Sequence, residues 1–149
     1  MVEPRLQHEQ TELHIPMRPW DSWADLTEFG GAMQAYFEQS QMDWPALLRD
    51  DNPVPVRLHV IRLGDAVICC NPAELYVEFG LAIKQRSPAR VTLIAELSDG
   101  WCGYVPTPEA IRHGGYSATT NRYTRLLPEA GWRITETTHQ MLHTVFDQT

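Results

Sequence analysis

The sequence lacks any long hydrophobic run. Its longest apolar stretches, such as residues 66–70, are far shorter than the roughly 20 residues that an α-helix needs to cross a bilayer. The first nine residues, MVEPRLQHE, contain no apolar signal core, so we expect the chain as written to carry no secretion signal and to remain in the cytoplasm. These absences predict a protein without a transmembrane segment.

Cysteine and positive charge are also scarce. The three cysteines form an odd set with no CxxC spacing, which argues against a disulfide framework or a zinc knuckle. Cys69 and Cys70 would point to opposite faces of a strand, so we expect these two and Cys102 to be free, buried thiols. With 12 Lys and Arg against 19 Asp and Glu, the net charge of -7 argues against nucleic acid or an anionic membrane surface as a general partner.

The residues that are present suffice for one domain with a core. The chain has 149 residues, of which 43% are hydrophobic, and it contains no internal repeat or low-complexity tract. Residues 1–10 are polar and are expected to be loose. Residues 11–149 are expected to form a single domain.

The first third of the chain is expected to contain a strand and a helix. Apolar and polar residues alternate over residues 11–17, which is typical of a short strand, and two prolines confine it to an edge or an end. A helix is expected to begin with Asp21 or Ser22 as N-cap, because apolar residues then recur at three- and four-residue steps as far as position 37. Residues 49–53 (RDDNP) have the composition of a loop.

The rest of the chain predicts a β-hairpin followed by mixed elements. Apolar residues alternate over the first strand of the hairpin, and Gly64 and Asp65 are typical of its tight turn. The expected elements are strands at 54–63 and 66–70, a helix at 73–85, a strand at 91–97, a long ordered loop at 98–123 with a helical turn near 108–112, and a helix at 128–146. This order predicts an α/β or α+β fold, with a mixed three- to four-stranded sheet, a β-hairpin and about three helices.

Glu74 is the first candidate for chemistry. It lies where the strand at 66–70 meets the expected helix, and the carboxyl ends of strands are where sites form in α/β proteins. The start of a helix also stabilises an ionised carboxylate. The alternative is that Glu74 is only a first-turn acid that interacts with the helix dipole.

Tyr104 is the second candidate. It lies in a glycine-containing segment that follows the strand at 91–97, and Gly100 and Gly103 allow a sharp turn or a close approach of the backbone. The alternative is a plain connection in which Tyr104 packs as an ordinary aromatic residue. Glu74 and Tyr104 both follow strand ends, but their spacing alone does not place them together.

The histidines give weaker signals. His139 and His143 are four residues apart on the last helix, which is metal-ligand spacing, but Gln140 stands where HExxH motifs have their glutamate. A solvated or capping role is therefore favoured for both. Three other histidines are isolated in the sequence and are expected to have structural roles: His14, His59 and His113.

Four segments of the chain match, in order, the motifs of one known enzyme family. IRLGDAVI (61–68), ending in PAE (72–74), resembles the family's strand, turn, strand and PGE element. GLAIKQRSP (80–88) is similar to the helix that follows in the bacterial relatives, and DGWCGYVPT (99–107) resembles their NGYxGYxPT loop. GGY (114–116), followed by RY (122–123), resembles the next landmark. Together the four segments resemble the neutral/alkaline non-lysosomal ceramidase family and its bacterial ceramidase-like relatives. The ordered match runs from about residue 13 to residue 146, and it corresponds to the C-terminal part of the family's catalytic domain.

The resemblance implies part of a zinc site. In the family two histidines, one glutamate and one tyrosine hold the zinc, and the matching positions here are Glu74 and Tyr104. The two histidines and a serine near the scissile amide lie far upstream in the family, outside the matching segment. The resemblance therefore implies a partial zinc-dependent hydrolase of N-acyl amides such as ceramide-like lipids. We expect it to be inactive alone and to bind Zn2+ only when a complementing N-terminal part supplies the other ligands.

The chain departs from the family pattern at three positions. Ala73 replaces a glycine, Asp99 an asparagine and Trp101 a tyrosine. These changes affect the expected substrate preference more than the two ligand positions. The alternative function is a non-catalytic binding or assembly module, such as a homo-oligomer, that keeps the fold.

Overall fold

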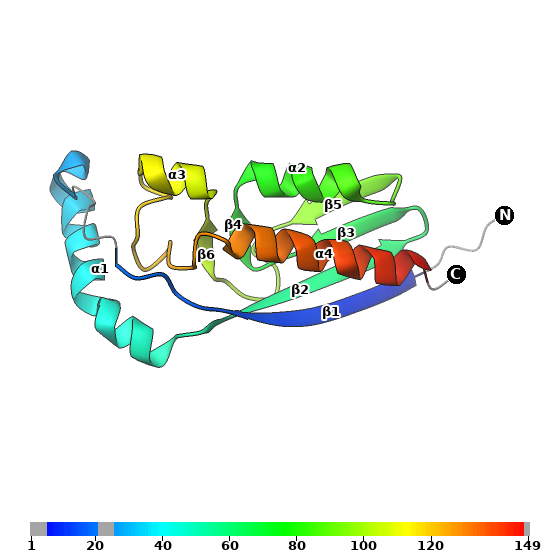
Figure 1. Cartoon of the computed structure of the whole chain (residues 1–149), viewed down its shortest axis with the longest axis horizontal. Helices are drawn as coiled ribbons and strands as arrows, with labels where there is room; N and C mark the ends of the chain where they lie inside the picture. The colour runs from blue at the N-terminus through cyan, green and yellow to red at the C-terminus, as the bar shows by residue number, and fades with distance from the viewer. Residues whose placement is uncertain (1–5, 21–25, 148–149) are drawn as a thin grey trace.

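The computed structural model describes residues 6–20 and 26–147, and it has an α+β architecture (Figure 1). The strands are β1 Leu6–Ile15, β2 Val54–Leu63, β3 Ala66–Cys70, β4 Ala73–Leu75, β5 Val91–Ala95 and β6 Gly103–Val105. The helices are the 3-10 helix η1 Leu26–Phe29, α1 Gly31–Asp50, α2 Val77–Arg86, α3 Pro108–His113 and α4 Ala130–Asp147. None of the helices in the described part of the chain is both long and apolar enough to span a membrane.

The main sheet is mixed, as the sequence predicts. Its strand order is β1-β2-β3-β5, with antiparallel β1–β2 and β2–β3 pairs and a parallel β3–β5 pair. The hairpin between β2 and β3 turns at Gly64, which has a φ of 63°, a value that favours glycine. A short second sheet pairs β4 and β6 in parallel. The four α-helices of the described residues include the short α3, where only a helical turn was expected.

The core lies between one face of the main sheet and the two helices α2 and α4. Alternate residues of β2 are buried on this face, from Val54 to Val60. In Figure 1, α4 runs along the sheet, and α1 stands at the end of the molecule away from the β2–β3 turn. Gly131 of α4 lies directly against the Phe79 ring of α2, so that even a methyl group there would overlap the ring. The two helices therefore pack closely where α4 begins.

The structure differs from three expectations for the N-terminal part. Residues Leu6 to Gln10, expected to be loose, are the first half of β1, because each pairs with a residue of the far half of β2. The expected helix from Asp21 or Ser22 falls partly on residues 21–25, outside the described residues. The described helix α1 begins later, at Gly31, since Gly30 and Gly31 have positive φ angles of 60° and 46°. It runs to Asp50, so the expected loop at 49–53 begins two residues late.

The helix expected at 73–85 also begins later than predicted. Residues 73–75 form β4, and the helix α2 begins only at Val77. The cause is the pairing with β6, which the Tyr76 N–H continues by donating to the Val105 carbonyl at 3.1 Å. Glu74 is therefore a strand residue, and the argument from the helix dipole is wrong.

Candidate functional site

Glu74 and Tyr104 lie directly opposite each other in the small parallel sheet. They are register partners in the β4–β6 pair, and the Glu74 carboxylate is close enough to the Tyr104 phenol to raise its pKa. Both residues are half-buried. The structure thus brings together the two residues that the sequence could only place at two strand ends.

Local backbone contacts fix this pair in position. Gly103 has a φ of 86°, and a side chain there would collide with the Tyr123 carbonyl, which also accepts a hydrogen bond from the Tyr104 N–H at 2.6 Å. On the other strand, buried Asn71 turns the chain into β4 by accepting a hydrogen bond from the Ala73 N–H at 3.0 Å. The strand that carries Tyr104 approaches residue 123 so closely that only glycine fits at position 103.

The pair is surrounded by other tyrosines. The Tyr116 ring meets the Tyr104 ring edge-on at a centroid distance of 5.9 Å, and the Tyr76 hydroxyl forms a 2.7 Å hydrogen bond with Ser117. The hydrogen bond to Glu74, then burial and the negative charge of Glu74, raise the pKa of Tyr104 above its ordinary value. The phenol therefore holds its proton at neutral pH while no cation is bound.

Glu96 is a second carboxylate at this site, and sequence reasoning missed it. Its pKa is raised by partial burial and by the charge of Glu74, against the effect of a hydrogen bond from the Leu75 backbone N–H. Glu96 directly follows β5, which ends at Ala95. A carboxylate directly after a strand end is a recognisable signal for a site residue. The sequence predicted a strand to residue 97, however, and this placed Glu96 inside the strand.

The oxygen donors of Glu74 and Tyr104 suit part of a zinc site. Carboxylate oxygen is an established zinc ligand, and catalytic zinc usually keeps three protein ligands. Within residues 6–20 and 26–147, no group of three or more His, Cys, Asp and Glu side chains is placed to hold a metal ion. The described residues therefore offer at most a fraction of a coordination shell.

The two histidines of the last helix do not complete this shell. His143 is exposed, as expected for a solvated residue. His139 is buried, with its Nε2 atom 3.3 Å from the Ala82 carbonyl, so the expected solvated or capping role is wrong for it. His139 instead links α4 to α2.

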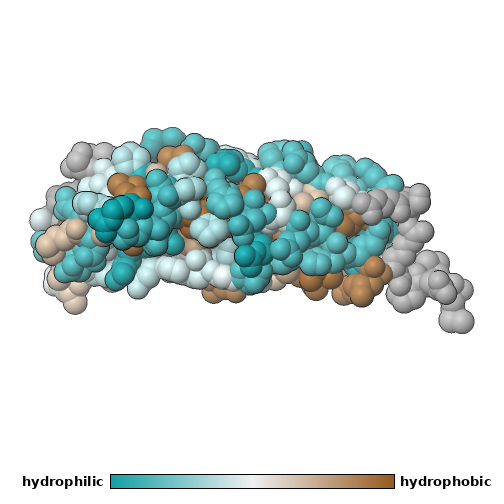
Figure 2. All heavy atoms as spheres, turned by 90° about the horizontal axis from the view of Figure 1, so that it is seen from below, coloured by the Kyte–Doolittle hydropathy of each residue, from teal (hydrophilic) through white to brown (hydrophobic). Residues whose placement is uncertain are grey.

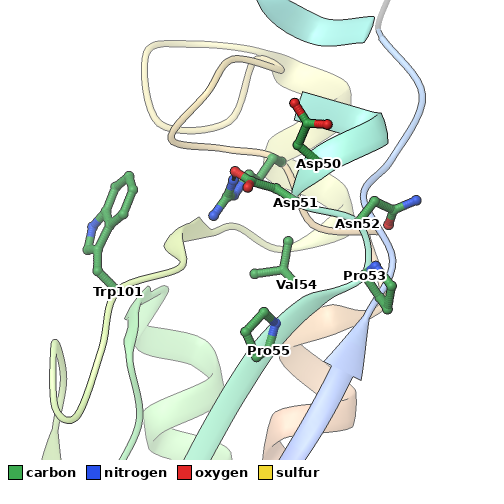
Figure 3. A pocket seen from close by; sticks show the side chains of 8 residues that line it. Asp50, Asp51, Asn52, Pro53, Val54, Pro55 and Trp101 are labelled. Carbon is green, nitrogen blue, oxygen red and sulfur yellow. Dashed lines mark hydrogen bonds and ion pairs between the residues drawn. The ribbon is translucent and has the colours of Figure 1, made fainter. Parts of the chain in front are cut away.

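A separate pocket of about 350 Å3 lies between the end of α1 and the segment before β6 (Figure 3). Figure 3 shows Trp101 on one side and Asp51 on the other. Asp51 forms an ion pair with Arg125, with 2.9 Å between Oδ2 and Nη1. The Trp101 ring meets the Tyr123 ring edge-on at a centroid distance of 5.1 Å. Since Tyr123 also bonds the backbone of Tyr104, this pocket adjoins the support of the Glu74–Tyr104 pair.

The three cysteines are free thiols, as expected. Cys69 and Cys102 are buried, and Cys70 on the opposite face of its strand is half-buried. Burial raises the pKa of Cys69 and of Cys102 to about 12, so neither thiol is a nucleophile at neutral pH.

Comparisons with known proteins find similarity at the level of structure. No family model matches the chain, and no curated protein matches it in sequence. A solved ceramidase complexed with C2 shares 17% identity over 66% of this chain, with a TM-score of 0.57. Neutral ceramidase from Pseudomonas aeruginosa shares 16% identity over 97% of this chain, with a TM-score of 0.64. The chain spans 16% and 29% of the lengths of these two proteins, and its fold is that of a part of neutral ceramidase, as the resemblance in sequence predicts.

Proposed function

We propose that the chain forms one part of the active site of a ceramidase-like amide hydrolase, in which Glu74 and Tyr104 bind zinc. The observation that carries this proposal is the direct pairing of these two residues across β4 and β6. The fold similarity to neutral ceramidase supports the same assignment. In this account the substrate is an N-acyl lipid.

The other zinc ligands come from residues beyond those described. Two oxygen donors alone hold zinc weakly, because catalytic sites usually use three protein ligands. The histidines are supplied by a complementing N-terminal part, either in the same polypeptide or in a partner chain. Zinc, when bound, would polarise the amide carbonyl and activate a water molecule.

The described residues control a proton at this site. The Tyr104 phenol keeps its proton beside the Glu74 carboxylate, so both oxygens can face one cation only if this O–H turns away or its proton leaves. Metal binding is therefore linked to proton release and is favoured at higher pH. Glu96, whose pKa is raised, is a neighbouring carboxylate that takes up a proton more readily than an exposed glutamate.

Complementation tests this function. The purified chain should show no hydrolysis of a fluorescent N-acyl sphingosine with added Zn2+. Co-expression with the N-terminal part of a ceramidase-like protein should produce turnover, which Glu74→Gln and Tyr104→Phe should abolish. Turnover by the chain alone that Glu74→Ala removes would contradict the inactivity. Complemented activity that survives both substitutions would contradict the ligand roles.

A non-catalytic assembly module is the second candidate, because the outer face of the main sheet is partly apolar. Leu6, Leu63, Ala66 and Val91 form one row across all four strands, and Leu6 is 72% exposed. Figure 2 shows hydrophobic residues gathered along the lower margin of that view. This candidate predicts a stable homo-oligomer by light scattering and no zinc binding with any complementing part.

A further inference from the structure

Two histidines contact each other on the outer face of the sheet. The His8 Nε2 and His59 Nδ1 atoms are 3.0 Å apart, and the two ring planes differ by only 13°. His8 pairs in register with Ile61, two residues from His59 on the same face of β2. His59, which is isolated in the sequence, is thus joined by strand pairing to a histidine 51 positions away.

A carboxylate orients His59. The Asp99 Oδ2 atom lies 2.9 Å from His59 Nε2. Arg57 donates a hydrogen bond to the same Asp99 oxygen at 3.0 Å and another to Glu12 at 3.0 Å. Asp99 therefore accepts the Nε2–H of His59, and this leaves a lone pair on Nδ1 that points at His8. A carboxylate that accepts the second ring N–H is the arrangement that orients metal-binding histidines.

The nitrogen separation matches cis ligands of one ion. Two metal–nitrogen bonds of roughly 2.0–2.1 Å at about 90° separate the nitrogens by about 2.9 Å, whereas tetrahedral bonds separate them by about 3.3 Å. The observed 3.0 Å is closer to the tetragonal value. His8 needs only to move its proton from Nε2 to Nδ1 to offer a second lone pair, which is a tautomer change without net loss of a proton.

We propose that His8 and His59 chelate a divalent transition-metal ion, with a preference for Cu2+, and that water completes the coordination. Tetragonal geometry with nitrogen ligands is typical of Cu2+, which also binds such sites more tightly than Zn2+. Glu74 and Tyr104 take no part in this chelate. The proposal stands or falls independently of the hydrolase function.

The test uses untagged chain stripped of metal and titrated with CuCl2 in a non-coordinating buffer. Electron paramagnetic resonance should show one tetragonal Cu2+ per chain with coupling to two imidazole nitrogens. His8→Gln and His59→Gln should each remove one nitrogen from the spectrum and weaken binding. Asp99→Asn should weaken it by roughly tenfold, as outer carboxylate partners of ligands do.

His14→Gln is the matched control, since His14 lies on the same strand as His8 and is exposed. It should leave affinity and spectrum unchanged. Circular dichroism melts verify that each variant is folded. Because His8 is exposed, His8→Gln should fold normally, and this variant alone decides the test if His59→Gln unfolds. A spectrum with a single nitrogen in the wild-type chain, or unchanged binding in His8→Gln, would overturn the chelate. Tighter binding of Zn2+ than of Cu2+ would overturn the preference.

Discussion

Tyr104 and Glu74 are register partners across the parallel strands β4 and β6, and the Glu74 carboxylate raises the pKa of the Tyr104 phenol. This contact joins two segments that are 30 residues apart in the sequence. It places two oxygen donors side by side in a fold that neutral ceramidase shares. It also makes the protonation of Tyr104 depend on Glu74.

The titration of Tyr104 should therefore respond to Glu74. The pKa of Tyr104 is above its ordinary value of 10.0, so the folded state holds this proton longer than the unfolded chain. The contribution to stability is complete below the unfolded pKa of about 10 and is lost as pH rises through the folded pKa. The tyrosinate absorbance of Tyr104 is assigned as the difference from the Tyr104→Phe variant. In Glu74→Gln this absorbance should appear at lower pH than in the wild type. An unchanged titration would show that Glu74 does not hold the phenol.

Gly131 should be intolerant of a side chain. A Cβ atom there would overlap the Phe79 ring, so Gly131→Ala should destabilise the fold by about 1–3 kcal/mol, as overpacked cores do. The matched control is Gly80→Ala on the facing helix, where a Cβ would lie 3.7 Å from Ile94 Cγ1. That substitution should stabilise by about 0.5–1 kcal/mol through helix propensity. Urea unfolding measures both, and equal effects would contradict the packing described.

Gly103 should be required for the site as well as for stability. Gly103→Ala places a methyl group against the Tyr123 carbonyl at a positive φ, and we expect a loss of more than about 2 kcal/mol. Gly64→Ala is the control, because its φ of 63° is also positive but open space surrounds it. It should cost only about 1–2 kcal/mol. Urea unfolding measures the stability loss of both variants. A smaller loss for Gly103→Ala than for Gly64→Ala would contradict the close approach to Tyr123.

The thiols should differ in reactivity. Burial raises the pKa of Cys69 and of Cys102 to about 12, and only Cys70 is partly accessible. In the folded chain at neutral pH, a disulfide reagent should label Cys70 slowly and the other two not at all, because the thiolate is the reactive form. All three should react after denaturation. Rapid labelling of Cys102 in the folded chain, detected by peptide mass spectrometry, would contradict its burial.

The β-hairpin and the mixed sheet could be predicted because their signals are local. Residues Val54 to Val60 alternate with polar residues, and Gly64 begins a tight turn, so periodicity and turn chemistry agree. The strand β4 has only three residues, which is too short to show a period, and its place depends on pairing with β6 far along the chain. For this reason Glu74 was assigned to a helix.

The contacts between candidate site residues depend on register, which composition does not reveal. Residues Leu6 to Gln10 are mostly polar, so their composition predicts a loose segment, whereas pairing with β2 makes them part of a strand. The same register brings His8 beside His59. Glu96 was missed because the end of β5 was predicted two residues late. The resemblance to ceramidases supplied what periodicity did not, namely a reason to consider Glu74 and Tyr104 together.

The zinc content of the complemented protein tests the central claim most directly. The chain should be purified together with a ceramidase-like N-terminal part, dialysed against a weak chelator and analysed by inductively coupled plasma mass spectrometry. We predict one zinc per complex in the wild type, and strongly reduced zinc in both Glu74→Gln and Tyr104→Phe, with Tyr116→Phe as the neighbouring control that retains it. Full zinc occupancy in both Glu74→Gln and Tyr104→Phe would contradict the assignment of this pair as metal ligands.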